Sequence, residues 1–184
     1  MATAKTGSFY LTETITIPAA SADGTRIQGS IDLGAYVNVA TGQAIAIDSV
    51  DFVHQAGTDL TQHPASMLSG NGTISSQLTD LNPGTAFVRA DNQSLVASAA
   101  LNVDVTQNIT SMSGDLYPDN FGPAALSEAF MVVNDTLYLV GGNDGAAVSG
   151  GNDLLLTARI RCRVVKLSNK DWMAIAIQST ASDN

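Results

Sequence analysis

Residues 154–165, LLLTARIRCRVV, decide the fold class of this 184-residue chain. In an extended chain, side chains two residues apart share a face. Arg159, Arg161 and Arg163 therefore line one face, while Ile160 and Cys162 line the other. The alternation predicts a half-buried β-strand with a line of positive charge, called here the arginine stripe (Arg159, Arg161 and Arg163). We expect an anionic group opposite the stripe: an aspartate of a neighbouring strand, a neighbouring subunit or an external polymer.

The same alternation recurs along the chain between Gly-, Pro- and Asn-Asp-containing turns. The strands that it predicts are 9–17, 26–39, 43–55, 74–78, 85–90, 94–105, 129–133, 136–140, 154–167 and 172–179. Within 43–55, the apolar phase switches near Ser49, which indicates a β-bulge or burial of both faces. Residues 107–127 are expected to form a loop, and 124–128 a short helix.

About eight to ten short strands, with at most one or two short helices, predict an all-β fold. Such strand density favours an antiparallel β-sandwich of about eight strands with long loops, or a barrel, over a parallel fold. Of the 17 acidic residues only Glu13 and Glu128 are glutamates, so strong helix formers are scarce. No shift in composition marks a boundary. We expect a single domain over 1–184, with an N-terminal arm at 1–7 and a loose tail at 180–184.

The charge is uneven along the chain. Residues 1–158 carry 3 basic and 15 acidic groups, a net of −12, and residues 159–184 carry 5 and 2, a net of +3, which together give the formal −9. This balance argues against a protein that coats nucleic acid with its whole surface, although one basic strip could still touch a genome. No stretch is apolar over the roughly 18 residues that a membrane helix needs, and no secretory signal is expected at the N-terminus.

The sequence predicts no catalytic site and no cofactor. His54 and His63 lack the spacing of a zinc site and the elements of a Ser-His-Asp triad. His54 is expected to be hydrogen-bonded or exposed. Cys162, the one cysteine, lies on the apolar face of its strand and is expected to be a core residue. The chain is therefore not expected to be an enzyme.

Asn-Asp recurs at 134–135, 143–144 and 152–153, with Gly-Gly before the second and third copies. This nine-residue period resembles the repeats of secreted calcium-binding β-rolls, and the resemblance implies a calcium site at Asp135, Asp144 and Asp153. The Gly-Gly pairs directly precede Asn-Asp, a departure from the family pattern, in which two residues separate the two. The alternative is a flexible loop that joins two antiparallel strands.

The order of the strands and their long connecting loops resemble the single jelly-roll capsid proteins of small icosahedral viruses. The resemblance implies a structural virion protein that self-assembles as a homo-oligomer, contacts copies of itself and other virion proteins, and resides in the virion. No family residue can be carried over, and genome contact stays open. One alternative is a phage decoration, tail or cell-surface lattice module, with calcium in residues 134–153. Another is a carbohydrate-active β-sandwich, although exposed aromatic platforms are scarce.

Overall fold

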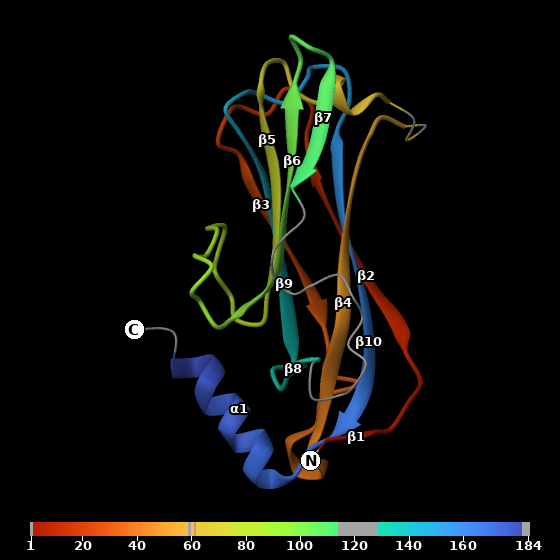
Figure 1. Cartoon of the computed structure of the whole chain (residues 1–184), viewed down its shortest axis with the longest axis vertical. Helices are drawn as coiled ribbons and strands as arrows, with labels where there is room; N and C mark the ends of the chain where they lie inside the picture. The colour runs from red at the N-terminus through yellow and green to blue at the C-terminus, as the bar shows by residue number, and fades with distance from the viewer. Residues whose placement is uncertain (1, 59, 61, 114–128, 182–184) are drawn as a thin grey trace.

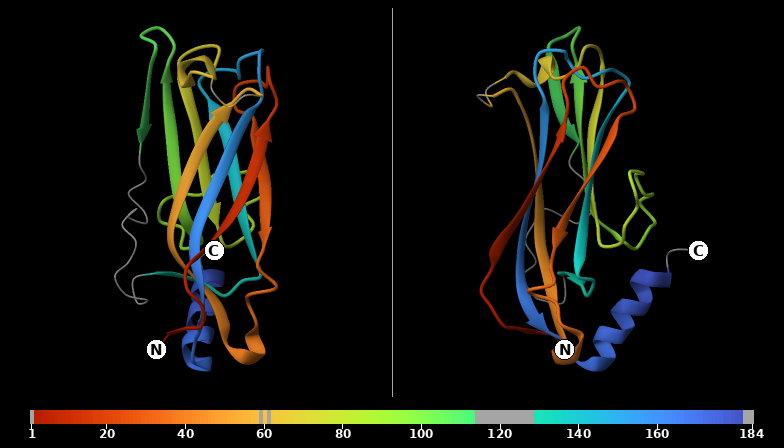
Figure 2. Two further views of the ribbon diagram at one scale, coloured as in Figure 1. Left: turned by 90° about the vertical axis from the view of Figure 1, so that its right-hand side faces the viewer. Right: turned by 180° about the vertical axis from the view of Figure 1, so that it is seen from behind.

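The computed structural model describes residues 2–58, 60, 62–113 and 129–181. Two antiparallel five-stranded sheets stand face to face along the long axis (Figures 1 and 2). Sheet A contains β1 (Thr3–Ala4), β2 (Phe9–Ile17), β4 (Gln43–Ala56), β8 (Phe130–Val132) and β10 (Leu154–Lys166). Sheet B contains β3 (Arg26–Asp32), β5 (Gly72–Thr79), β6 (Leu95–Asp104), β7 (Ile109–Ser113) and β9 (Thr136–Asp144). Two short 3-10 helices, η1 (Val39–Thr41) and η2 (Pro64–Ser66), and one α-helix, α1 (Asn169–Ala181), complete the described elements.

The strand pairing is that of a jelly roll. The first long strand pairs with the last, β2 with β10, and the pairing continues inward as β3 with β9, β4 with β8 and β5 with β6. Further pairs, β4 with β10 and β5 with β9, close the two sheets. This is a hairpin of paired strands rolled into a double sheet. The predicted all-β, jelly-roll-like sandwich is confirmed.

The strand β10 lies at the centre of sheet A. It pairs with β4 along its whole length on one side. On the other side it pairs with β2 and, nearer its C-terminal end, with β1 of the predicted N-terminal arm. The Lys5 amide also donates to the Val164 carbonyl at 2.8 Å. β1 is thus hydrogen-bonded to the C-terminal end of β10, where it pairs with backbone groups that β2 does not reach.

One apolar core fills the space between the sheets. Its largest fully buried side chains come from both sheets and from the chain that connects them: Ile17, Leu33, Ile45, Ile47, Met67, Ile74, Leu78, Leu137, Leu139, Leu154, Leu156 and Ile160. A polar contact crosses this core, where His54 Nε2 on β4 lies 3.2 Å from Ser76 Oγ on β5. The expectation that His54 is hydrogen-bonded is confirmed.

The predicted bulge in β4 is also confirmed. Arg161 pairs with Ser49, but the next residue, Cys162, pairs with Ile47, so Asp48 is the extra residue. Without this residue, Ile45 and Ile47 could not face the core together with Val50, because strand faces alternate with a period of two.

The predicted C-terminal strand 172–179 is wrong, because α1 occupies this segment. Ser168 begins the helix, and its Oγ accepts a hydrogen bond from the Asp171 amide at 3.2 Å. Apolar residues at 172, 175 and 176 lie on one face of a helix. They pack with Ala44, Ala46 and Val165 of sheet A in a second, smaller core. The last turn includes Thr180 and Ala181, so these two residues of the predicted loose tail are helical, and the rest of that tail lies outside the described residues.

Three other expectations for local structure need correction. No strand forms at 85–90, and β7 occupies part of the predicted loop 107–127. The predicted helix at 124–128 lies outside the described residues. The Gly-rich loop is shorter than expected, because β9 continues through Gly141 and Gly142. A Cβ atom on Gly141 would collide with the side chains of Leu156 and Ile15, so glycine here permits the close approach of the two sheets.

Candidate assembly surface

The arginine stripe projects from the outer face of sheet A. Its neighbours in sequence, Ala158, Ile160, Cys162 and Val164, all belong to the core, so alternation directs the arginines outward. The three side chains do not share one environment. Arg163 is ion-paired and Arg159 is stacked on an aromatic ring, whereas Arg161 and Arg163 each have a buried Nε without a partner among the described residues.

The bulge in β4 supplies the partner of Arg163. Asp48, the extra residue, turns its carboxylate to the outer face, where Arg163 Nη2 donates to Asp48 Oδ1 at 2.7 Å. The Asp48 side chain is only 5% exposed and that of Arg163 21%, so the pair is largely removed from water. The expected aspartate of a neighbouring strand is therefore present opposite Arg163. Its charge also acts on Cys162: burial, and then the Asp48 charge, raise the pKa of this thiol to about 12.

Arg159 and Arg161 are placed differently. The Arg159 guanidinium lies 5.4 Å from the centre of the Tyr10 ring, a cation–π contact, and Asp51 is its register partner on β4. Arg161 has Tyr10 and Ser49 as register partners, which carry no charge. Its Nε is buried and has no hydrogen-bond partner within the described part of the chain. The stripe therefore retains donor capacity at its centre.

The aspartates that the nonapeptide resemblance implied for calcium do not come together as a group. Asp135 precedes β9 and Asp144 ends it, so a nine-residue strand, about 30 Å long, separates them. Two of these carboxylates interact with groups nearby: Asp144 forms an ion pair with Arg26 at 3.4 Å, and Asp153 accepts a hydrogen bond from the Ala19 amide at 2.8 Å. Across the described ranges no group of three or more His, Cys, Asp or Glu side chains is placed to hold a metal ion.

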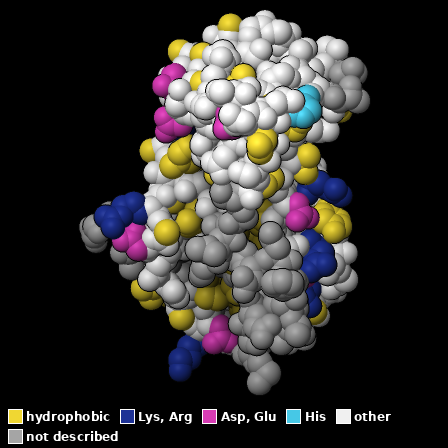
Figure 3. Space-filling view, turned by 45° about the horizontal axis from the view of Figure 1, so that its top comes forward, with side chains coloured by type: hydrophobic (Ala, Val, Ile, Leu, Met, Phe, Trp, Pro, Cys, Tyr) yellow, Lys and Arg dark blue, Asp and Glu magenta, His cyan; other side chains and the backbone are white. Residues whose placement is uncertain are grey.

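Large apolar side chains are exposed near both ends of the sandwich and on α1. They are Tyr10, Val39, Leu60, Val105, Ile109, Met112, Met173 and Ile177. Val105, Ile109 and Met112 lie around the β6–β7 turn, at the opposite end of the long axis from α1 (Figure 1). Figure 3 shows that hydrophobic and uncharged polar atoms cover most of the visible described face, with few charged side chains.

A hollow of about 480 Å³ lies between α1, β8 and the β5–β6 connection. Asp80 contributes to its wall and is 2% exposed. Burial raises the pKa of Asp80 to about 6, against the opposing effects of its backbone hydrogen bond and of Asn134. No sequence pattern indicates this hollow, since its residues come from three separate segments and share no motif.

Comparisons with known proteins give similarity in structure only. No protein-family profile matches the sequence, and no curated protein matches it. The structure is similar to chimpanzee polyomavirus VP1, at 8% identity and a TM-score of 0.44, over 90% of this chain and 99% of that one. It is also similar to a chain of desmodium yellow mottle tymovirus, at 8% identity and a TM-score of 0.30, over 89% and 91%. Within the described residues no helix is long and apolar enough to cross a membrane.

Proposed function

We propose that this chain is a structural subunit of an icosahedral virus shell, one domain that assembles with copies of itself and does not act as an enzyme. The observation that carries the proposal is the set of large exposed apolar side chains on a jelly roll of low charge. Eight such side chains are exposed among the described residues, and only 14% of the chain is charged. The centres of subunit interfaces are depleted in charge and rich in such residues.

The C-terminal helix gives the most specific part of this surface. Trp172, Ile175 and Ala176 pack on the second core. Met173 and Ile177, one turn apart, are 56% and 62% exposed on a different side of the helix. A helix that is apolar on more than one side usually has a partner on each. We infer that the second partner of α1 is a neighbouring subunit.

The arginine stripe is proposed as a second contact of the assembled particle. Asp48 already neutralises Arg163, whereas Arg159 and Arg161 have no ion pair within the described ranges. These two could receive a carboxylate of a neighbouring subunit, another virion protein or the backbone of a genome. The location of the protein would then be the virion.

Assembly is tested by light scattering and negative-stain microscopy of the purified protein. We expect closed particles or rings for the natural sequence. Met173→Asp with Ile177→Asp should give monomers, while the subunit melts at almost the same temperature, because both side chains are exposed.

The control places one such charge elsewhere. Thr85→Asp lies in an exposed part of the β5–β6 connection and should leave particles intact. A natural chain that stays monomeric at high concentration would contradict the proposal. Assembly that survives in the double variant would remove α1 from the contact.

A further inference from the structure

The hollow between α1, β8 and the β5–β6 connection has a polar side and an apolar side. Its polar lining residues are Asp80, Asp91, Asn92, Gln93 and Gln178. Its apolar lining residues are Ala90, Leu95, Ala129, Phe130, Met131 and Ile175. Among the described residues that line it there is no lysine or arginine, and both ionisable groups of the lining, Asp80 and Asp91, are carboxyls that would repel an anion.

One buried polar group in this hollow lacks a partner. Asp80 Oδ1 is buried and makes no hydrogen bond to any residue of the described ranges. The other oxygen, Oδ2, accepts a long hydrogen bond of 3.4 Å from Asn134 Nδ2. An unpartnered buried oxygen is costly, and a donor supplied from outside the chain would remove that cost.

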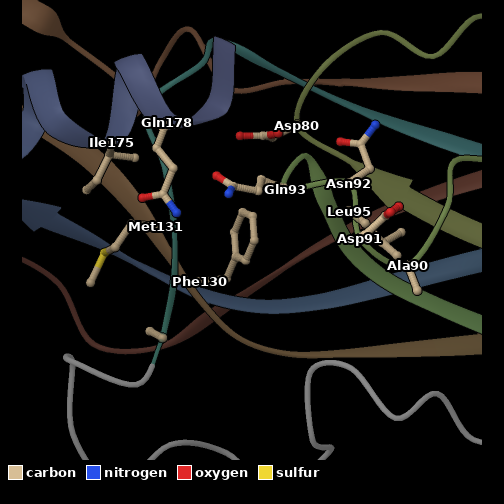
Figure 4. Close-up of a pocket in the computed structure, with 11 residues that line it drawn as sticks. Asp80, Ala90, Asp91, Asn92, Gln93, Leu95, Phe130, Met131, Ile175 and Gln178 are labelled. Atoms are coloured by element: carbon tan, nitrogen blue, oxygen red, sulfur yellow. The ribbon is translucent and has the colours of Figure 1, made fainter. Parts of the chain in front are cut away.

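The side chains around Asp80 are suited to a donor that carries positive charge. Figure 4 shows the polar ends of Asp80, Gln93 and Gln178 directed toward the same part of the hollow, with the Phe130 ring beside them. Amide oxygens and an aromatic ring both stabilise an ammonium group. The apolar residues can contact an alkyl chain, as they would the stem of a lysine.

We propose that this hollow binds a primary alkylammonium group, with the nitrogen at Asp80 and the alkyl chain against Phe130, Met131 and Ile175. The same chemistry is present in a free aliphatic diamine and in a lysine side chain of a second copy. The proposal concerns the single subunit and holds whether or not a shell forms.

Binding should depend on pH. The charged groups that line the hollow are Asp80, at the end of β5, and Asp91, in the β5–β6 connection, whose carboxylate lies 3.2 Å from exposed Arg89. The residues from β8 and α1 are uncharged. Because the pKa of Asp80 is raised to about 6, its carboxyl is mostly ionised at pH 7.5 and mostly protonated at pH 5. Affinity for an ammonium group should fall accordingly.

The test titrates the dissociated subunit with n-butylamine and 1,4-diaminobutane and follows the side-chain amide signals of Gln93 and Gln178 by NMR. Both amines should shift these signals at pH 7.5, and 1-butanol, which has the alkyl chain without the charge, should not. Asp80→Asn should weaken binding at least about tenfold. Asp23→Asn makes the same change of charge in the β2–β3 connection, outside the hollow, and should have no effect.

A tethered amine keeps the proposal testable even if Asp80→Asn fails to fold. Gln178→Lys should exclude both free amines and raise the melting temperature of the subunit. The proposal is overturned if the natural subunit binds neither amine, if 1-butanol binds equally well, or if Asp80→Asn binds as tightly as the natural chain.

The assembled protein identifies the source of the ammonium group. If a lysine of a second copy fills the hollow, assembled protein should exclude the amines, and one of Lys5→Gln, Lys166→Gln or Lys170→Gln should reopen it. If the natural ligand is a free amine, the assembled protein should bind diamine as the subunit does. Either result supports the proposal and distinguishes the two sources.

Discussion

The buried pair of Arg163 and Asp48 gives the sharpest test of how sheet A is stabilised. Arg163→Met keeps the stem of the side chain and removes its charge, which leaves the Asp48 carboxylate, 5% exposed, without a counter-charge. For charge centres about 4 Å apart at an effective dielectric constant near 20, the lost attraction is about 4 kcal/mol. Removing one partner of a buried pair usually costs about 3–5 kcal/mol. We expect a loss of about 3–4 kcal/mol in the free energy of unfolding.

The reverse change should cost less. In Asp48→Asn, the Arg163 side chain, 21% exposed, can turn its guanidinium toward water. We expect a loss of about 2 kcal/mol, between the values for exposed and fully buried pairs. The double variant, Asp48→Asn with Arg163→Met, removes both charges and should lose far less than the sum of the single variants.

Urea denaturation of the dissociated subunit, followed by circular dichroism, measures all four free energies of a double-mutant cycle. Single variants that each lose less than about 1 kcal/mol would refute the reasoning, because the pair would then behave as an exposed one. Losses that simply add in the double variant would refute it too, because the two charges would not interact.

Two further changes test the core. Burial lowers the pKa of His54 to about 4 in the folded chain, so the unfolded chain binds more protons between pH 6.5 and 4, and the free energy of unfolding should fall as pH drops through this window. Urea denaturation at several pH values should show a shallower fall in His54→Gln than in the natural chain. An equal fall in both proteins would contradict this. Gly141→Ala should lower the free energy of unfolding by about 1–3 kcal/mol, because the added methyl group overlaps with Leu156 and Ile15. The control, Gly150→Ala, adds a methyl group that meets no atom within 4 Å and should lower it far less. Equal melting temperatures of the two variants would contradict the close approach of the sheets.

The features that sequence reasoning found are those that depend on alternation. The outward stripe at Arg159, Arg161 and Arg163 follows from a period of two, and the bulge follows from a break in that period near Ser49. The identity of the partner of Arg163 did not follow, because Asp48 reaches it only through the bulge. Two segments 115 residues apart supply this pair.

The misread segments carry signals that fit two structures. Residues 172–179 are apolar at both odd and even positions, which a strand and a helix both allow, and the Ser168 cap and three alanines favour the helix. Gly141 and Gly142 have the composition of a turn, but in the fold Gly141 allows the two sheets to approach, and Gly142 leaves room for the Arg26 side chain. The hollow at Asp80 depends on the distance between three segments, which no local pattern encodes.

The position of β10 between β2 and β4 determines when sheet A can fold during synthesis of the chain. The central strand of sheet A follows the other strands of this sheet in the sequence, so β2 and the part of β4 beyond its short pairing with β8 have no partner strand until residue 166 has been made. Pairing the first long strand with the last gives a high contact order, and such chains fold slowly. Folding of sheet A is therefore completed only after β10 has been synthesised, and until then the nascent chain exposes strand edges that are prone to aggregation.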